Sequence, residues 1–349
     1  MTSTEYRGLA GVPLSLTPLN RKDFTSDQEV RWCPGCGDYA VLAAFQGLMP
    51  ELGIKRENTV IVSGIGCSSR FPYYVDCYGM HSIHGRATAI ATGVAIARDD
   101  LAVWVVTGDV DALSIGGNHL IHALRRNVNI TIMLFNNRIY GLTKGQYSPT
   151  SEIGKVTKST PMGSLDNPFN PVSLALGAEA TFVARTIDSD RQHLTSVLKA
   201  AADHRGAALV EIYQNCPIFN DEAFEAVKGV EASEGIIGLR QGEPITFGSQ
   251  NQWGLVRTTT GVEVALVADV GLDAILVHDA TVDDPTTAFA LSRLTDTGVL
   301  RRAPIGIFRN VERPAYDDLA RAQVNTARVD DPDSALEALI AGKDTWTVA

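Results

Sequence analysis

One stretch near the middle of the chain constrains its fold more than any other. Leu101–Val106 (LAVWVV) is a continuous apolar run of strand length, which Thr107-Gly108 ends. Apolar residues at helical spacing then run over Ala112–Val128, and a second apolar run, Ile130–Phe135 (ITIMLF), follows. Two strands joined by a helix form a βαβ unit, whose strands lie parallel with a right-handed crossover. We therefore predict an α/β protein with a mostly parallel sheet and helices on both faces.

Polar residues follow both of these strands at the point where each one ends. Asp109 comes directly after the first strand, and Asn136-Asn137 come directly after the second. The carboxyl ends of parallel strands meet at one edge of a sheet, where open α/β proteins bind their ligands. Mg²⁺ usually takes one or two carboxylates, with amide oxygens, water and phosphate completing its octahedron. Asp109, Asn137 and a nearby backbone carbonyl therefore suit a metal-bridged diphosphate, although each half alone is also an ordinary turn.

Composition and charge exclude several classes of function. The chain has 349 residues, 45% hydrophobic and 20% charged, which is typical of one large or two modest globular domains. Its net charge of −10 argues against nucleic acid and anionic membranes as partners, since both attract basic proteins. No apolar run is long enough to span a bilayer and the amino terminus lacks a signal-peptide pattern, so we expect a cytoplasmic protein.

Five cysteines in a cytoplasmic protein are expected to be metal ligands or free thiols rather than disulfides. Four of them lie beside predicted elements: Cys33 and Cys36 in CPGCG before a predicted helix, Cys67 in GIGCSSR after the strand Thr59–Ser63, and Cys216 after the strand Ala208–Tyr213. The Pro34-Gly35 turn presents the first two sulfurs to one side, as chelation requires. Alone, a CxxC pair fits zinc, an iron–sulfur cluster or thiol redox chemistry.

His84 and Arg86 precede a predicted small-residue helix, Ala87–Ala97. The amino end of a helix, together with a cation, favours bound anions, so this segment is a candidate part of a phosphate pocket. A turn histidine and a structural arginine would give the same pattern.

These motifs together resemble those of a known family. GDVDALSIGGNH, RRN and NNRIYGLTKGQYSPTS resemble the thiamine-diphosphate motif of the β subunits of two-subunit 2-oxoacid:ferredoxin oxidoreductases. CPGCG, GIGCSS and the Cys-Pro after a late strand resemble that family's 4Fe–4S ligand segments. The resemblance implies a thiamine-diphosphate-binding fold. One departure is Val110, where the family usually has glycine, and a Cβ there would crowd the diphosphate or require a different turn.

The resemblance also implies which residues form the site. Mg²⁺ would be held by Asp109, by the side chain of Asn137 and by the carbonyl of Ile139. The cluster would be bound by Cys33, Cys36, Cys67 and Cys216, one iron for each thiolate, with Cys77 outside the set. A structural zinc site would use the same four cysteines. The residues expected to contact thiamine diphosphate are Ile65, Gly66, Ser68, His84, Gly108, Asp109, Val110, Asp111, Asn137, Ile139, Gly141, Leu142 and Thr143. Arg70 and His84 are the candidate catalytic residues, Arg70 as a carboxylate or phosphate contact.

The reaction that the resemblance implies converts a 2-oxoacid, coenzyme A and oxidised ferredoxin into acyl-coenzyme A, CO₂ and reduced ferredoxin. The SPTS and RRN forms resemble 2-oxoglutarate enzymes more than pyruvate enzymes, so 2-oxoglutarate and succinyl-CoA are favoured and pyruvate is the alternative. A non-redox thiamine decarboxylase half with structural zinc, or a non-catalytic scaffold, would also fit the motifs.

Partners are expected for two reasons. Thiamine enzymes need a glutamate that polarises the aminopyrimidine, and nothing in this sequence supplies it, so an α subunit is expected. By resemblance the heterodimers would pair into a heterotetramer. Ferredoxin is usually acidic, as this chain is, so docking requires a local basic patch, for which Arg21, Lys22 and Arg31 are the candidates.

The chain is predicted to have three parts. Residues 1–29 form an arm, residues 30–225 the thiamine-diphosphate and iron–sulfur domain, and residues 226–349 a region that packs on this domain and on the partner subunit. Within the last part, Val262–Val267 and Ala274–His278 are strand-like, and Thr286–Leu294 and Ser334–Ile340 have the spacing of amphipathic helices.

Overall fold

The computed structural model describes residues 7–229, 232–295, 298–346 and 348. Residues 1–6 of the predicted arm, and residues 230–231, 296–297, 347 and 349 of the predicted C-terminal region, lie outside this set.

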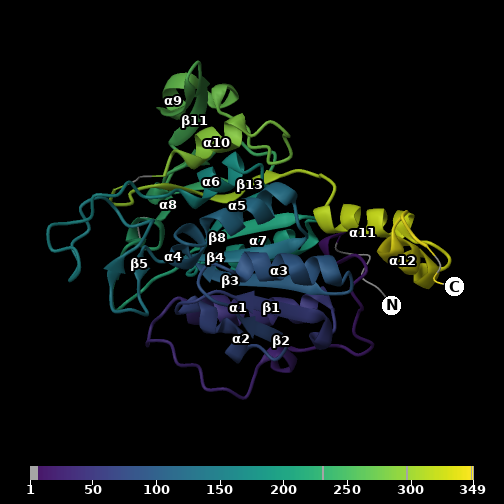
Figure 1. Cartoon of the computed structure of the whole chain (residues 1–349). Coiled ribbons are helices and arrows are strands. Elements are labelled where there is room, and N and C mark those ends of the chain that lie inside the picture. Colours follow the sequence, from purple (N-terminus) through teal and green to yellow (C-terminus); the bar gives the residue numbers. More distant parts are fainter. Residues whose placement is uncertain (1–6, 230–231, 296–297, 347, 349) are drawn as a thin grey trace.

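An eight-stranded sheet lies at the centre of the molecule, in the order β2-β1-β3-β4-β8-β7-β13-β9 (Figure 1). Its strands are β1 (Thr59–Ser63), β2 (Tyr78–His81), β3 (Ala102–Gly108), β4 (Ile130–Asn136), β7 (Phe182–Ile187), β8 (Ala207–Tyr213), β9 (Ile236–Leu239) and β13 (Ala303–Asn310). All pairs from β2 to β7 are parallel, whereas β13 runs antiparallel to β7 and parallel to β9. The predicted mostly parallel sheet is confirmed.

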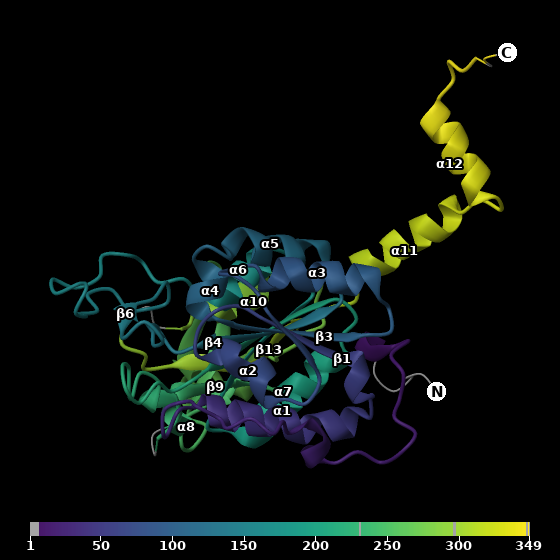
Figure 2. The same ribbon diagram turned by 60° about the horizontal axis from the view of Figure 1, so that its bottom comes forward.

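Helices cover both faces of this sheet (Figure 2). One face carries α1 (Asp38–Leu52) and α7 (Arg191–Asp203), and the other carries α3 (Ala87–Ala97), α5 (Gly117–Arg126) and α6 (Pro171–Gly177). Because both faces are covered, β4, β7 and β8 are buried at every residue. That is why these strands appear in the sequence as continuous apolar runs rather than as alternating patterns.

The central βαβ unit is confirmed, but its connection differs from the prediction. The single helix expected over Ala112–Val128 is instead α4 (Asp109–Leu113) followed by α5. The break between them brings Gly116 against the loop after β2, where a Cβ on Gly85 would lie 2.5 Å from the Gly116 Cα. Only two glycines allow this approach, and it places the His84 loop beside the start of α4.

The region after residue 225 completes the central sheet with β9 and β13, an arrangement that the sequence did not indicate. It also forms a small antiparallel sheet of β10 (Thr246–Phe247), β11 (Trp253–Thr258) and β12 (Gly261–Leu266), next to α10 (Thr286–Ser292). The predicted strand over Ala274–His278 is wrong: a 3₁₀ turn, Leu272–Ala274, precedes an irregular segment with one isolated bridge, between Pro244 and Val277. Its backbone hydrogen bonds are divided between two neighbouring segments, because the Leu276 N–H donates to the Leu255 carbonyl oxygen at 2.7 Å and the His278 N–H to the Glu243 carbonyl oxygen at 2.9 Å.

The remaining elements are short or peripheral. They are α2 (Phe71–Tyr74), α8 (Ala232–Gly235), α9 (Val267–Val270), the hairpin of β5 (Ile139–Tyr140) and β6 (Gln146–Tyr147), and the C-terminal helices α11 (Tyr316–Ala327) and α12 (Pro332–Ala341). Figure 2 shows α11 and α12 projecting from the body. In the described part of the predicted arm, Phe24 is fully buried against the core. Among the described residues, no helix has the length and apolar character needed to cross a bilayer.

Candidate active site

Loops at the carboxyl edge of the sheet carry the predicted site residues. The parallel register pairs Gly108 of β3 with Phe135 of β4, and Asn136 of β4 with Tyr213 of β8. The loops that follow these strands therefore begin side by side, as expected for ligand sites in open α/β sheets.

Asp109 is buried in the first turn of α4, with 2% of its surface exposed. Burial raises the pKa of its carboxyl to about 6, and a hydrogen bond from Thr150 opposes that rise. The Thr150 Oγ1 lies 2.5 Å from the Asp109 Oδ2 and 2.9 Å from the Asn136 Oδ1. One hydroxyl proton serves only one of these acceptors at a time. Thr150 therefore orients the Asp109 carboxylate before any cation binds to it.

The two adjacent asparagines point to different sides. The Asn136 Nδ2 donates to the Glu211 Oε1 at 2.7 Å, inside the core, where Glu211 also pairs with Arg185 at 2.7 Å. The Asn137 Nδ2 donates to the Gln214 Oε1 at 3.0 Å. Successive side chains at the end of a strand alternate in direction, which explains the split. The structure joins Asp109 to Asn136 through Thr150, while Asn137, the predicted metal ligand, turns its amide toward Gln214.

Asp111 ties the loops around the start of α4 together. Its Oδ1 accepts from the Gly85 backbone N–H at 2.8 Å and lies 3.4 Å from the His84 Nδ1, and its Oδ2 accepts from the Thr107 hydroxyl at 3.1 Å.

Val110 lies within α4, so this turn accommodates a Cβ as any helix does. Of the other predicted cofactor contacts, Ser68 and Ile139 are buried, Ile65, Gly66, Gly108, Val110 and Gly141 are half-buried, and His84, Leu142 and Thr143 are exposed.

A second part of the site is a cavity of about 350 Å³ on the other side of Asn137. Four cysteines line it, Cys33, Cys36, Cys67 and Cys216, together with Gln214 and Gly141. A Cβ on Gly141 would lie 3.5 Å from the Cys67 Sγ and 3.7 Å from the Cys216 Sγ, so the backbone passes close to both sulfurs. Cys77 lies elsewhere, with its Sγ 3.5 Å from the Tyr78 carbonyl oxygen.

The thiols in this cavity are partly removed from solvent. Burial raises the pKa of the Cys67 thiol to about 12, and it also raises the pKa values of Cys36 and Cys216. Cations in the cavity would favour the thiolate forms that bind metal. Among the described residues, no three His, Cys, Asp or Glu side chains converge on a position for one metal ion. In a 4Fe–4S cluster each thiolate binds a different iron, so four cysteines that line one cavity fit this group in ligand type and number.

The two predicted catalytic residues belong to different parts of the site. Arg70 lines the cysteine cavity, where its Nη1 donates to the Arg31 carbonyl oxygen at 3.0 Å. His84 lies on the loop packed against α4, with its imidazole exposed.

Three residues with contacts in the site were not predicted as site residues from the sequence: Thr150, Asn136 and Gln214. Gln214 carried a readable signal, because it follows the buried strand β8 directly, as Asn137 follows β4. Thr150 lies in the SPTS part of the family motif, but its contact with Asp109 could not be read from the sequence, since that bond spans 41 residues.

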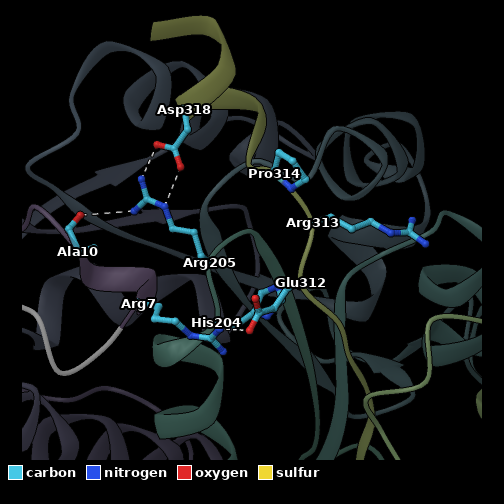
Figure 3. A pocket seen from close by; sticks show the side chains of 8 residues that line it. All are labelled: Arg7, Ala10, His204, Arg205, Glu312, Arg313, Pro314 and Asp318. Atoms are coloured by element: carbon cyan, nitrogen blue, oxygen red, sulfur yellow. Dashed lines mark hydrogen bonds and ion pairs between the residues drawn. The ribbon is translucent and has the colours of Figure 1, made fainter. Parts of the chain in front are cut away.

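A cavity of about 790 Å³ lies at the opposite, amino edge of the sheet (Figure 3). Its lining residues are Arg7, Ala10, His204, Arg205, Glu312, Arg313, Pro314 and Asp318. Figure 3 shows Arg205 facing Asp318 and Arg7 facing Glu312, and both contacts are ion pairs. One pair connects the amino-terminal segment to the segment before α11, and the other connects the loop before β8 to α11, which indicates a structural role.

Comparisons with known proteins identify the family. Residues 64–212 match the family described as thiamine pyrophosphate enzyme, C-terminal TPP binding domain. A β subunit of 2-oxoacid:ferredoxin oxidoreductase 1 from Aeropyrum pernix is 46% identical over 190 residues, 54% of this chain and 60% of that protein. The 2-oxoglutarate oxidoreductase subunit KorB of Mycobacterium tuberculosis is 67% identical over 341 residues, 97% of this chain and 91% of that protein. This chain belongs to the β-subunit family of 2-oxoacid:ferredoxin oxidoreductases.

A solved structure supports the same placement for this β subunit. The 2-oxoglutarate:ferredoxin oxidoreductase from Magnetococcus marinus, with 2-oxoglutarate, coenzyme A and succinyl-CoA bound, contains a chain that matches with a TM-score of 0.76 and 33% identity. The match covers 95% of this β subunit and 100% of that chain. The family resemblance of the motifs and the thiamine-diphosphate-binding fold are thereby confirmed, and the chain is a subunit of a thiamine-dependent oxidoreductase.

Proposed function

We propose that this β subunit, together with an α subunit, converts 2-oxoglutarate and coenzyme A into succinyl-CoA and CO₂. Two electrons leave through a 4Fe–4S cluster on Cys33, Cys36, Cys67 and Cys216 to two molecules of oxidised ferredoxin, and one proton is released. The enzyme would act in the cytoplasm as a heterotetramer of two α and two β subunits.

The observation that carries this proposal is the short connection between the two halves of the site. Asn136 is linked to Asp109 through Thr150, and Gly141 lies against the sulfurs of Cys67 and Cys216. Five residues of extended chain span at most about 18 Å. The diphosphate edge and the cysteine cavity are therefore joined by one short segment, which supports electron transfer between groups bound in each.

Within this proposal the protein supplies position and charge. Thiamine diphosphate would supply the electron sink for decarboxylation. Asp109, Asn137 and the Ile139 carbonyl would hold Mg²⁺ against the diphosphate, which matches the oxygen chemistry that Mg²⁺ prefers. Thr150 and Asn136 orient Asp109, and Asp111 holds the His84 loop beside the start of α4.

A partner subunit is supported by the exposure of the predicted thiamine contacts. The side chains of His84, Leu142 and Thr143 face solvent on this chain, although cofactor contacts in an active site are normally enclosed. An α subunit would cover them and supply the glutamate for the aminopyrimidine. Coenzyme A and ferredoxin would then approach the assembled complex.

2-Oxoglutarate is preferred to pyruvate because the Mycobacterium tuberculosis relative is named for it and the Magnetococcus marinus enzyme binds it. Arg70 on the cysteine cavity is our candidate for a substrate carboxylate or phosphate contact.

The test is to purify the chain anaerobically with its co-expressed α subunit and to measure reduction of ferredoxin with a panel of 2-oxoacids. We expect coenzyme A-dependent turnover with 2-oxoglutarate, weaker turnover with pyruvate and none by the β subunit alone. A colourless protein that contains zinc instead of iron would support the non-redox alternative. Failure to bind thiamine diphosphate with Mg²⁺ would support a non-catalytic scaffold.

A further inference from the structure

Gln214 occupies the position between the two halves of the site. It is the first residue after β8, with 1% of its surface exposed, and its backbone N–H donates to the Asn136 carbonyl oxygen at 3.0 Å. Its side chain lines the cysteine cavity.

Every polar group of the Gln214 side-chain amide has a partner. The Nε2 donates to the Cys36 Sγ at 3.3 Å and to the Asn215 carbonyl oxygen, while the Oε1 accepts from the Asn137 Nδ2 at 3.0 Å. A reversed amide would set its oxygen against the Asn215 carbonyl and its NH₂ against the Asn137 NH₂. The surroundings therefore fix one orientation, with the donor side toward the sulfur.

We propose that Gln214 is a positioning residue that raises the reduction potential of the cluster through its N–H···S hydrogen bond to Cys36, while its carbonyl holds the amide of Asn137. The proposal rests on the proposed function, in which Cys36 is a cluster ligand. Hydrogen bonds to the sulfurs are among the factors that set cluster potentials. A donor stabilises the reduced cluster more than the oxidised one, because the reduced cluster carries one more negative charge.

Gln214 provides a neutral donor at this sulfur, because its Nε2 lies 3.3 Å from the Cys36 Sγ and its side chain is almost fully buried. Removing it should make the cluster harder to reduce.

The bond to Asn137 gives Gln214 a second role at the metal edge. With its Nδ2 held by Gln214, the Asn137 amide leaves its Oδ1, which accepts from the Ile139 N–H at 3.2 Å, as the oxygen available to a cation. The Gln214 side chain thus contacts Cys36, the proposed cluster ligand, and Asn137, the proposed Mg²⁺ ligand.

The experiment compares Gln214→Met with Gln46→Met in the full chain, purified anaerobically with its partner subunit. Methionine keeps the length of glutamine and removes both N–H donors. Gln46 is a matched control, because it is also buried, at 3% exposure, but its Nε2 donates to the Tyr74 carbonyl oxygen at 2.9 Å. The midpoint potential of the cluster is measured by redox titration followed by electron paramagnetic resonance. Iron and sulfide content are measured on the same samples.

We expect the ratio of reduced to oxidised cluster, at a fixed potential, to fall about tenfold in Gln214→Met, a shift of about 59 mV to lower potential for a one-electron couple. Gln46→Met should match the wild type. A full iron content with an unchanged potential in Gln214→Met would overturn the inference and leave the proposed function standing. A wild-type protein that holds no cluster would overturn the proposed function itself.

A variant that fails to assemble its cluster would still leave the inference testable. Gln214→Glu keeps the shape and lacks the donors, and its potential should also fall. In wild-type protein with ¹⁵N-labelled glutamine side chains, electron–nuclear double resonance should detect a coupled amide nitrogen near the reduced cluster. Absence of that coupling in the wild type would contradict the hydrogen bond to Cys36 directly.

Discussion

Four aspartates, two at each edge of the sheet, have opposite surroundings. At the carboxyl edge, burial raises the pKa of Asp109 to about 6 and that of Asp38 to about 7. At the amino edge, the buried Asp317 pairs with Arg321 at 2.7 Å, and the pKa of Asp318 is lowered by hydrogen bonds from Arg205 and Arg321 that outweigh partial burial. The cavity in Figure 3 lies among such pairs, whereas the cysteines surround the cavity at the other edge.

This difference separates stabilising charges from functional ones. A buried carboxylate with a cation and hydrogen bonds contributes to the fold, and loss of one partner destabilises the protein. A buried carboxyl with a raised pKa costs stability in the free chain, so such groups are frequent where a ligand or metal completes the set. We therefore interpret the larger cavity as a structural junction and the smaller one as part of the proposed site.

The largest expected effect concerns the cysteines. Serine at Cys33, Cys36, Cys67 or Cys216 should abolish the cluster, because each thiolate is expected to bind a separate iron. Cys77→Ser should leave the iron content at the wild-type level, since Cys77 lies outside the cavity. Iron and sulfide analysis of the five variants measures this. A cluster that survives Cys67→Ser but not Cys77→Ser would show that the ligand set is wrong.

The next two predictions compare a buried aspartate at each edge of the sheet, Asp109 and Asp317. Asp109→Ala should weaken Mg²⁺-dependent thiamine-diphosphate binding by more than about 100-fold, because even residues that only support a metal ligand contribute 10- to 100-fold. The stability of the free chain should be unchanged or higher, since a buried carboxyl is removed. Asn137→Ala should weaken binding less.

Asp317→Ala should lower the stability of the protein and leave its cofactor affinity unchanged. It leaves the Asn129 N–H without its carboxylate partner and removes one of the two carboxylates that contact Arg321, at a cost of about 1–3 kcal/mol of unfolding free energy. Thiamine-diphosphate affinity should stay at the wild-type value. Calorimetric titration measures the cofactor affinity of both variants, and denaturant unfolding measures their stability. Equal effects of Asp109→Ala and Asp317→Ala on cofactor affinity would refute the contrast between the edges.

His204 at the amino edge should make one contribution to the pH dependence of stability. Burial lowers the pKa of His204 from 6.5 to about 4. At this residue the folded state therefore binds fewer protons than the unfolded state between these pH values. This contribution to the unfolding free energy should be complete above about pH 6.5, shrink as the pH drops toward 4, and level off below it, with a total loss of up to about 3 kcal/mol. The raised pKa values of Asp38 and Asp109 contribute with the opposite sign.

His204→Gln should remove this contribution at some cost in stability, since the imidazole contacts the Thr181 hydroxyl at 2.7 Å and the Asn310 Oδ1 at 3.0 Å. Urea unfolding of the two proteins at a series of pH values gives the difference in unfolding free energy between them. A difference that does not change with pH would refute the assignment to His204.

The smallest expected effect concerns ferredoxin. Arg31 lines the cysteine cavity, whereas Arg21 contacts Gln46, roughly 12 Å along α1 from its start beside Cys36. Arg31→Glu should therefore raise the KM for ferredoxin about two- to fivefold, and the Arg21→Glu, Lys22→Glu double variant less, because exposed charge pairs contribute about 0.2–1 kcal/mol. The KM for the 2-oxoacid should not change.

Electron transfer to ferredoxin should also slow with rising salt, as the Debye length falls below about 10 Å. A rate that responds neither to salt nor to Arg31→Glu would place ferredoxin elsewhere on the complex.

Several features of the fold and site could be predicted because their signals are local. The apolar runs of β3, β4 and β8 identify buried strands, and residues after parallel strands share an edge by topology alone. The cysteine segments and Asp109 were found for the same reason. The strand predicted over Ala274–His278 failed because the backbone there bonds to two different segments, near Glu243 and at Leu255, so one isolated bridge forms instead of a ladder.

The sequence by itself determined the parallel βαβ unit, the candidate ligands at its carboxyl edge and the family to which the chain belongs. Only the tertiary structure decided that β9 and β13 complete the sheet, that Thr150 reaches Asp109, and that Gln214 connects Asn137 to Cys36. The reason is physical. A strand's periodicity reports which of its residues are buried, but the partner of a buried polar group is set by side-chain direction and by segments far apart in sequence, and neither follows from local pattern.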